Sequence, residues 1–410
     1  MNKMTPQIRF QGFTDDWEER KLGRIGETFT GLSGKTKEDF GHGDAKFVTY
    51  VNVFENPISN PNKTERVEID EKQNQIKYGD VFFTTSSETP EEVGMSSVWL
   101  DNTENIYLNS FCFGYRPTTE LDSYYLAFML RSPSIRKKFM FLAQGISRYN
   151  ISKTKVMELE VPVPEIDEQK KVGSFFKTLD DTIALHQRKL DLLKEQKKGF
   201  LQKMFPKNGA KVPELRFAGF ADDWEERKLS EGTSKIGDGL HGTPNYSDNG
   251  DVFFINGNNL VNGKIVITKE TKLVTESNQS KDDKLLNMDT ILMSINGTIG
   301  NLAWYNNERV MLGKSAAYLT VSNFDKKFIF SYLQTSTIKN YFLNNLTGTT
   351  IKNLGLKTIR DTTLFVPTLE EQQKIGSLFK QLDDTIALHQ RKLDLLKEQK
   401  KGFLQKMFIS

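Results

Sequence analysis

The sequence predicts an internally duplicated chain in which two globular segments alternate with two copies of one long helix. Two repeats indicate this: DDWEERKL stands at Asp15–Leu22 and Asp222–Leu229, and LDDTIALHQRKLDLLKEQKKGFLQKMF stands unchanged at Leu179–Phe205 and Leu382–Phe408. The short copies begin 207 residues apart and the long copies 203. Each half is therefore a variable segment of roughly 150 residues followed by a near-constant segment of roughly 40, a self-similarity typical of repeated architectures.

Length and composition set the outer limits. The chain has 410 residues, of which 37% are hydrophobic and 27% charged, so it can build more than one apolar core. Its 56 basic and 53 acidic residues give a net charge of +3, which excludes a basic tail but leaves room for a local basic face. Cys112 is the only cysteine, so an internal disulfide and a multi-cysteine metal site are excluded.

No apolar run approaches the ~18 residues of a membrane span, and the first residues lack the apolar core of a signal peptide. We therefore expect a cytoplasmic protein without a membrane segment. The repeats divide it into two globular and two helical parts, at 1–163, 164–206, 207–366 and 367–410.

The two variable segments differ strongly yet share landmarks. Trp17 matches Trp224, and Trp99 matches Trp304, positions that we interpret as core. The two domains therefore share a frame and differ in their loops, while identical segments join them. This pattern suits two domains that recognise different targets on one symmetric scaffold.

The constant segment has the apolar spacing of a long helix without proline. With Ile183 at position a of a heptad, the seam of the first copy is Phe176, Leu179, Ile183, His186, Leu190, Leu193, Lys197, Phe200 and Met204. The second copy repeats it at Phe379, Leu382, Ile386, His389, Leu393, Leu396, Lys400, Phe403 and Met407.

The polar seam positions predict how the two helices pair. A parallel pair would place Lys197 on Lys400, a repulsive contact. An antiparallel pair instead matches polar with polar and apolar with apolar: Leu190 with Leu396, Ile183 with Phe403, Leu179 with Met407, and His186 with Lys400. We therefore predict an intramolecular antiparallel coiled coil, in which cysteines at 183 and 403 cross-link and cysteines at 183 and 386 do not. A second apolar line, Leu185, Leu192 and Leu201, lies off the seam and contacts either the chain's own domains or separate subunits.

No catalytic constellation is visible in the sequence. GDGLHG at Gly237–Gly242 fits a dinucleotide-binding pattern, but Thr243-Pro244 follows where a helix must begin. The four histidines lack metal-ligand spacing, so no metal site is expected. These absences favour a binding or assembly role.

Several loops have the composition of nucleic-acid contacts, being rich in Ser, Thr, Asn and Gly with interspersed Arg, Lys and Tyr. The candidates in the first half are Lys35, Lys37, Ser86, Thr89, Arg148, Tyr149, Asn150 and Lys153. The candidates in the second half are His241, Asn245, Tyr246, Asn258, Asn259, Asn296, Thr298, Thr349, Lys352 and Asn353. The first constant helix adds nine basic and five acidic residues over Glu168–Phe205, which is either a solvated face or a positive spine near phosphates.

The order of these parts resembles the specificity subunits of type I restriction–modification systems. The motifs are P-x-x-x-E-Q-x-[KR]-[IV]-[GA] at Pro164–Gly173 and Pro367–Gly376, each followed by L-D-x-x-I, with a Gly-x-x-x-x-Asn lead-in at Gly145–Asn150 and Gly348–Asn353. The resemblance covers the whole chain.

The resemblance implies a mixed α/β (α+β) class, with two target-recognition domains that each read one half of a split, asymmetric double-stranded DNA sequence. The paired helices would form the spacer between them. Two methylation subunits and further restriction subunits would dock, and these partners would hold S-adenosylmethionine, ATP and Mg²⁺. The chain itself would carry no cofactor and no catalytic residue. Two alternatives are a coiled-coil adaptor without a DNA role and a methyltransferase fused to recognition domains, which the missing methyltransferase motifs disfavour.

Overall fold

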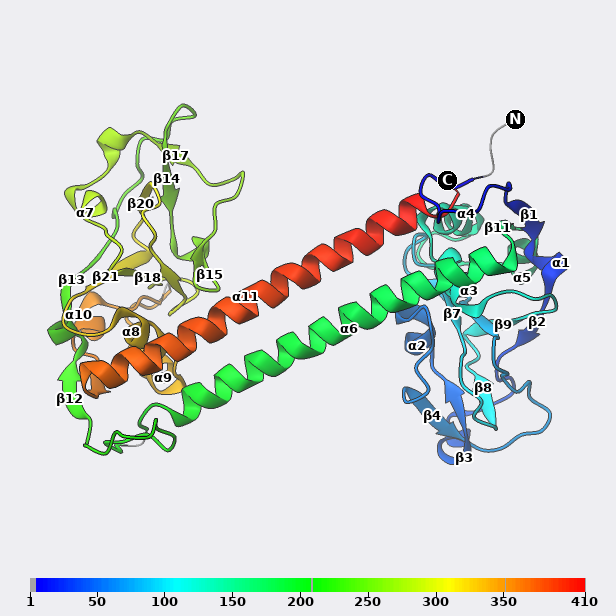
Figure 1. The fold of residues 1–410 in the computed structure, drawn as a ribbon, viewed down its shortest axis with the longest axis horizontal. Coiled ribbons are helices and arrows are strands. Elements are labelled where there is room, and N and C mark those ends of the chain that lie inside the picture. Colours follow the sequence, from blue (N-terminus) through cyan, green and yellow to red (C-terminus); the bar gives the residue numbers. More distant parts are fainter. Residues whose placement is uncertain (1–4, 208, 351, 410) are drawn as a thin grey trace. The chain divides into compact units, whose positions relative to one another are not determined.

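A computed structural model describes residues 5–207, 209–350 and 352–409 (Figure 1). The chain forms two compact units: unit 1 comprises 1–187 and 391–410, and unit 2 comprises 188–390. Each unit thus combines one variable segment with half of each long helix. The unit boundaries fall inside the helices, so the four-part division of the sequence stays a prediction.

Unit 1 is a mixed α/β unit. Its strands are β1 (Glu18–Lys21), β2 (Gly26–Thr30), β3 (Phe40–Val48), β4 (Thr64–Val67), β5 (Val81–Thr84), β6 (Ser86–Ser87), β7 (Ser96–Val98), β8 (Ile106–Leu108), β9 (Cys112–Pro117), β10 (Tyr149–Asn150) and β11 (Glu160–Val163). Its helices are α1 (Leu22–Ile25), α2 (Tyr50–Glu55), α3 (Ser123–Met129), α4 (Pro133–Leu142), α5 (Lys153–Met157) and the first part of α6 (Ile166–Lys203), with a 3-10 turn at Lys37–Asp39.

The strands of unit 1 form an antiparallel sheet in the order β2-β9-β5-β7 and a smaller sheet in the order β4-β3-β8. All four residues of β5 are buried, as expected for a central strand. The rings of Phe83 and Phe139 stack at 5.6 Å and so attach α4 to this sheet.

Unit 2 repeats this plan. Its strands are β12 (Glu225–Lys228), β13 (Thr233–Asp238), β14 (Val252–Ile255), β15 (Leu260–Val261), β16 (Lys264–Ile265), β17 (Leu273–Val274), β18 (Thr290–Ser294), β19 (Leu302–Trp304), β20 (Val310–Leu312), β21 (Ala316–Val321) and β22 (Thr363–Val366). Its helices are α7 (Lys281–Lys284), α8 (Lys326–Tyr332), α9 (Ser336–Asn344), α10 (Leu356–Arg360) and the first part of α11 (Leu369–Lys406), with 3-10 turns at Leu229–Gly232, Gly257–Asn259 and Glu276–Asn278.

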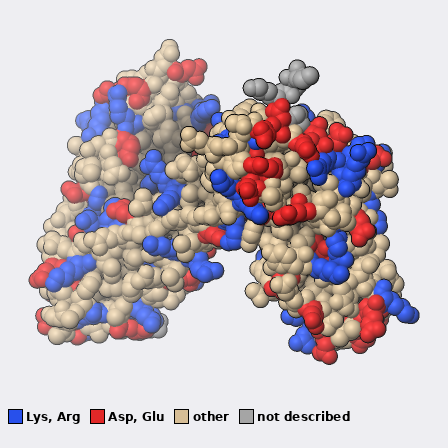
Figure 2. All heavy atoms as spheres, turned by 45° about the vertical axis from the view of Figure 1, so that its right-hand side comes forward, with Lys and Arg blue, Asp and Glu red and all other residues tan. Residues whose placement is uncertain are grey.

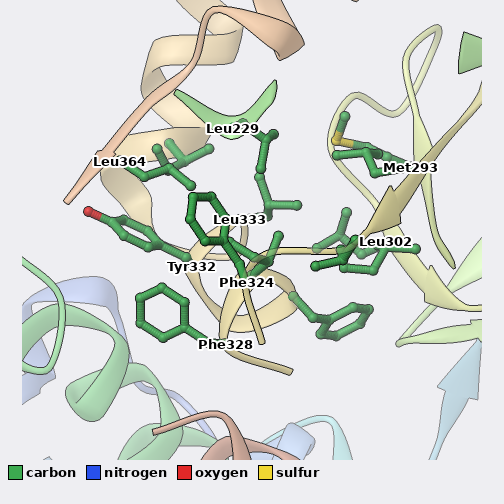
Figure 3. Packing of buried hydrophobic residues seen from close by; sticks show 14 of the residues in the cluster. Leu229, Met293, Leu302, Phe324, Phe328, Tyr332, Leu333 and Leu364 are labelled. Atoms are coloured by element: carbon green, nitrogen blue, oxygen red, sulfur yellow. The ribbon is translucent and has the colours of Figure 1, made fainter. Parts of the chain in front are cut away.

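The sheets of unit 2 have the orders β13-β21-β18-β19 and β17-β14-β20, the same four-plus-three arrangement as in unit 1. In both units the three-stranded sheet contains one parallel pair, β3–β8 or β14–β20. Figure 3 shows Leu229, Phe328 and Leu364 converging from three elements in the core of unit 2. The predicted duplication of a mixed α/β fold is confirmed.

The tryptophans lie mostly where the sequence predicted them. Trp17, Trp99 and Trp224 are buried. Trp304 is only half-buried; its ring stacks on Phe330 at 3.8 Å, and the Lys326 ammonium lies 5.0 Å from its centre.

The Glu-Gln pair of the constant motif joins each long helix to the start of its half. Glu168 is buried and accepts hydrogen bonds from Arg9 Nε at 2.7 Å, Arg9 Nη2 at 2.8 Å and Trp17 Nε1 at 2.9 Å. Glu371 binds Arg216 in the same bidentate way, at 2.7 and 2.8 Å. Such fork-to-fork pairs fix orientation as well as charge.

The neighbouring glutamine closes the same joint. Gln169 Oε1 accepts from the backbone N–H of Asp122 at 3.0 Å, and its Nε2 donates to Pro164 O at 2.8 Å. Gln372 makes the equivalent bonds with Asp325 and Pro367, at 2.9 Å each. The motif therefore has a structural role, which the sequence alone did not reveal.

The halves of the two long helices run antiparallel within each unit (Figure 1). In unit 1, the ring of Phe175 lies 5.0 Å from that of Phe403, and Lys400 Nζ lies 2.5 Å from Asp180 Oδ1. In unit 2, Lys197 Nζ lies 2.6 Å from Asp383 Oδ1. The predicted orientation agrees with these contacts.

The residues that touch between the two helices are not the pairs that the heptads predicted. Phe403 was expected opposite Ile183 but contacts Phe175, and Lys400 was expected opposite His186 but binds Asp180. The reason is that aspartates just off the seam neutralise the seam lysines, whereas seam residues alone were considered. A coiled coil over the full helix length stays a prediction.

The burial of the helices follows the expected faces. Phe176, Leu190, Phe379 and Leu393 of the seam are buried. The second apolar line is exposed at Leu185 and Leu192 and at their duplicates, Leu388 and Leu395. Leu201 instead packs against the core of unit 2. No helix in the described part of the chain is both long and apolar enough to cross a membrane.

Candidate nucleic-acid interface

The same pair of loops meets in both units. In unit 1, β10 pairs antiparallel with β6, so that Asn150 lies opposite Ser86. In unit 2, an antiparallel bridge joins Asn353 to Asn296. Ser86 and Asn296 both follow the central strand of a four-stranded sheet, β5 or β18. The duplication therefore places two candidate stretches of each half side by side.

A small closed loop presents each asparagine. The backbones of Asn150 and Gln144 exchange two hydrogen bonds, at 2.8 and 2.9 Å, and those of Asn353 and Thr347 exchange two at 2.9 Å. Gly145, with φ of 142°, opens the first loop, and a side chain there would meet the carbonyl oxygen of Arg148. The Gly-x-x-x-x-Asn spacing is thus the signature of a loop closed on itself, with glycine where no side chain fits.

In unit 1 the structure brings together most of the predicted residues. Ser86, Tyr149 and Asn150 share the β6–β10 pair, Arg148 directly precedes β10, and Lys153 opens the adjacent helix α5. Arg148, Asn150 and Lys153 are exposed, as is Thr89 in the loop after β6.

Lys35 and Lys37 belong to a different loop. Lys35 Nζ lies 2.9 Å from Asp70 Oδ2. Hydrogen bonding to Asp70 raises the pKa of Lys35, and hydrogen bonds from Lys35 and Gln73 hold the pKa of Asp70 at about 2. The charge of Lys35 is therefore already neutralised inside the protein. Lys37 is exposed at the start of a 3-10 turn.

A hollow of about 340 Å³ lies beside the β6–β10 pair. Its lining comprises Tyr50, Phe54, Ser86, Ser87, Glu88, Glu92, Phe111 and Arg148. The rings of Tyr50 and Phe54 stack at 5.9 Å, and Tyr50 Oη donates to Ser86 O at 2.7 Å. Burial raises the pKa of the Tyr50 hydroxyl, which therefore stays a donor at neutral pH. Sequence reasoning missed the three aromatic residues, although Tyr50 and Phe54 show the i, i+4 spacing of one helix face.

In unit 2 a half-buried link through Ser315 joins the candidate stretches. Ser315 Oγ donates to Asn256 Oδ1 and accepts from Gly257 N, both at 2.9 Å. The backbone N–H of Ile295 donates to Ser315 O at 3.0 Å, and that of Leu354 donates to Ile295 O at 2.9 Å. The loops at 256–259, 294–298 and 349–353 are thereby connected.

The loop at 239–246 lies next to this link, because Leu240 N donates to Leu312 O at 2.8 Å at the end of β20. His241 Nε2 lies 2.7 Å from Asp238 Oδ2. The ring of Tyr246 meets that of Phe254 edge-on at 5.9 Å. The start of this loop thus adjoins the other three predicted stretches, whereas Tyr246 at its end lies beside β17, where it bridges Val274.

The individual candidates in unit 2 differ in what they can offer a ligand. Asn245, Asn258, Thr298, Thr349 and Lys352 are exposed, whereas Ile351 between the last two lies outside the described residues. Asn259 serves the fold, since its amide donates to Val266 O at 2.9 Å and its Oδ1 accepts from Asn256 N at 2.9 Å. Asn296 Oδ1 is buried without a hydrogen-bond partner among the described residues.

Charges of both signs are interspersed on the face of the molecule in Figure 2. The described residues of this face therefore form no broad basic field of the kind that binds phosphates without regard to sequence (Figure 2). The described residues contain no group of three side chains that could hold a metal ion.

Comparison with known proteins gives the class. The family model of the type I restriction modification DNA specificity domain matches this chain twice, at residues 14–195 and 221–398. The chain belongs to this family. It is a DNA specificity subunit of a type I restriction–modification system and not an enzyme, because in these systems catalysis lies in other subunits.

Particular relatives agree. A protein of Methanocaldococcus jannaschii described as the putative type I restriction enzyme MjaX specificity subunit is 23% identical over 414 residues, which is 95% of this chain and 92% of that protein. The crystal structure of the S subunit from M. genitalium aligns with a TM-score of 0.65 and 16% identity, over 99% of this chain and 100% of that one. A chain from a structural study of type I R-M complex assembly aligns with a TM-score of 0.54 and 18% identity, over 95% of this chain and 96% of that one.

Proposed function

We propose that this subunit reads a split, asymmetric DNA sequence, with unit 1 reading one half and unit 2 the other. The observation that supports this most directly is the duplicated loop pair, Ser86 with Asn150 and Asn296 with Asn353. One backbone arrangement thus presents two different sets of side chains. Because base edges are read by donors and acceptors, two different sets select two different half-sequences.

The exposed polar groups of each loop pair divide into two roles. Arg148 and Lys153 in unit 1, and Lys352 in unit 2, are exposed cations that would contact phosphates and fix the register on the duplex. Amides and hydroxyls such as those of Asn150 and Thr298 would meet base edges. Removing a phosphate contact should weaken binding to all sequences, whereas removing a base contact should relax one position.

The long helices would act as the spacer between the half-sites. Each contains 38 residues, about 57 Å at 1.5 Å per residue. Half-site separation is a geometric property in proteins that place two readers on one duplex, where one turn measures about 34–36 Å. Inserting one helical turn into both α6 and α11 should lengthen the gap and leave both half-sequences unchanged.

The partners follow from the same proposal. Two methylation subunits would dock on the helices. The exposed Leu185 and Leu395 of unit 1, and the exposed Leu192 and Leu388 of unit 2, are apolar groups that support such docking. Restriction subunits would join them. S-adenosylmethionine, ATP and Mg²⁺ would bind in these partners, and the complex would work in the cytoplasm, where chromosomal DNA is accessible.

The experiment is to co-express the chain with its methylation subunit in a host free of DNA methylation and to map N6-methyladenine across the genome. We expect one split motif with two different halves and a fixed gap. An intact complex that methylates no site would contradict the proposal.

A further inference from the structure

The side chains that line the hollow of unit 1 differ in chemistry from those at the matching described positions of unit 2. The backbone N–H of Thr85 donates to Phe111 O at 3.0 Å, and the backbone N–H of Ile295 makes the same bond with Ser315 O in unit 2. Phe111 and Ser315 therefore occupy matching positions, and the exposed ring of Phe111 stands where unit 2 has a serine. Ser86 and Asn296 are the matching residues that pair with the asparagine loops. Two residues after them stand Glu88 in unit 1 and Thr298 in unit 2. Unit 1 therefore offers an aromatic and acidic recess where unit 2 offers hydroxyls and amides.

Two half-buried arginines hold the walls of this hollow. Arg131 donates four hydrogen bonds to backbone carbonyls: to Ser96 at 2.6 Å, Val53 at 2.8 Å, and Phe54 and Asn56 at 2.9 Å. Three of these carbonyls belong to α2 or its end, and α2 carries Tyr50 and Phe54. Arg131 makes no ion pair within the described residues, and burial lowers its pKa to about 9.

Arg136 holds the opposite wall in the same way. Its guanidinium donates to Gly94 O at 2.7 Å, Glu91 O at 2.8 Å and Val93 O at 2.6 Å. Burial lowers its pKa to about 10. These bonds fix the loop that carries Glu88 and Glu92. Two half-buried guanidinium groups that are spent on backbone carbonyls, and not on carboxylates, indicate a site whose shape is held in advance.

Unit 2 lacks both supports. The residue corresponding to Arg131 is Gln334, which donates to Phe330 O at 3.0 Å within its own helix and accepts from Lys197 at 2.7 Å. The residue corresponding to Arg136 is Lys339. The rigid recess is therefore a feature of unit 1 and not of the shared frame.

The polar groups that face the recess are mainly acceptors. Glu88 is exposed and makes no hydrogen bond or ion pair with any described residue. Glu92 Oε2 accepts from Ser87 Oγ at 3.1 Å. Arg148 adds one exposed cation at the rim. A carboxylate repels phosphate and accepts hydrogen bonds, so this recess fits a base edge that presents an amino group, beside a phosphate bound by Arg148.

We propose that unit 1 reads an exocyclic amino group, of cytosine or adenine, through the Glu88 carboxylate, with Tyr50 and Phe111 forming the apolar sides of the recess. This inference rests on the proposed DNA-reading function and deepens it. Arg131 and Arg136 are positioning residues: they touch no DNA and hold α2 and the 88–94 loop in place.

The test is a methylation map of the Glu88→Gln variant in the complete complex. Glutamine keeps one acceptor and adds a donor, so a single position in one half of the motif should relax. Methylation of the original sites should fall roughly 5- to 140-fold, the change that corresponds to one lost base contact. The base that is specified in the wild-type map and relaxed in the variant map then distinguishes cytosine from adenine.

Glu91→Gln is the matched control, because Glu91 is an exposed carboxylate on the same loop whose side chain does not line the recess. Its map should equal that of the wild type. An unchanged motif in Glu88→Gln, or an equal loss across both halves in an intact complex, would overturn the inference. A wild-type complex that is intact and methylates nothing would instead overturn the proposed function, and this inference with it.

Discussion

Unit 1 and unit 2 share their frame and differ where they would meet a ligand. Both attach a long helix to the start of their half through a bidentate arginine–glutamate pair, Arg9 with Glu168 and Arg216 with Glu371. Both close a small loop on an asparagine. On that frame unit 1 builds a recess of rings and carboxylates, whereas the described residues of unit 2 place Ser315 and Thr298 at the positions of Phe111 and Glu88. The comparison teaches that the near-identical segments hold a matching pair of loops in each unit, and that the divergent segments give the two pairs different side chains. In the proposed function, this difference sets what each unit would read.

The largest effect should come from the joint that the two units share. Glu168→Ala removes the buried carboxylate and leaves the half-buried Arg9 guanidinium unpaired. We expect a loss of about 3 kcal/mol in the free energy of unfolding, the lower end of the range for broken buried pairs. Glu371→Ala should cost nearly as much. Urea unfolding followed by circular dichroism measures both, and a cost below ~1 kcal/mol for either variant would show that the joint is not structural.

A second effect distinguishes two glycines of α6. A side chain at Gly173 would meet Asp122 Oδ1 at 2.4 Å and Tyr125 N at 2.6 Å, so Gly173→Ala should destabilise by about 1–3 kcal/mol. At Gly199 a side chain would meet no atom of the described structure within 4 Å, so Gly199→Ala should stabilise the helix by up to about 1 kcal/mol.

Thermal unfolding of the two variants shows whether each substitution lowers or raises the stability. Equal effects would mean that the close approach of α6 to α3 is absent in solution. Gly376→Ala should behave like Gly173→Ala, because the same contact is repeated with Asp325 at 2.5 Å.

A smaller effect should separate the two matched tryptophans. Trp17 Nε1 donates to Glu168 at 2.9 Å, whereas Trp224 Nε1 is buried without a partner among the described residues. Trp17→Phe should therefore cost about 1 kcal/mol more than Trp224→Phe, the net value of a typical intramolecular hydrogen bond. Paired unfolding curves check the difference, and a larger cost at Trp224 would contradict it.

The smallest effect depends on pH and belongs to unit 1 alone. The folded pKa of Asp70 is about 2, below the unfolded value of about 3.9. A depressed carboxylate pKa contributes stability that is present above pH ~4 and lost as the pH falls toward 2. Asp70→Asn should therefore flatten the stability of unit 1 over this window. An unchanged acid profile would show that Lys35 and Asp70 are not paired in solution.

The sequence predicted much of the fold because its strongest signals are local or repeated. Identical copies indicated the duplication, and heptad spacing indicated two long helices with antiparallel halves. The Glu168–Arg9 joint was missed, because its partners are 159 residues apart and neither residue type indicates a buried site. The heptads likewise ignored Asp180 and Asp383, which lie just off the seam and bind its lysines.

The candidate site was predicted as loops and not as a shape. Ser86 and Asn150, or Asn296 and Asn353, were chosen for composition, and the structure places each pair together. Tyr50, Phe111 and the supporting Arg131 were missed, because a recess depends on side chains from four chain segments whose proximity only the folded unit defines. Whether the chosen residues touch DNA stays a prediction.

The central claim is that one frame carries two different readers. The most direct test is a chimaera in which residues 15–163 are replaced by residues 222–366, so that both halves carry the variable segment of unit 2; both segments begin with DDWEERKL and end just before a proline. Its N6-methyladenine map, made with the methylation subunit, should show a motif with two copies of one half-sequence that is already present in the wild-type motif. A motif that keeps two different halves would contradict the claim.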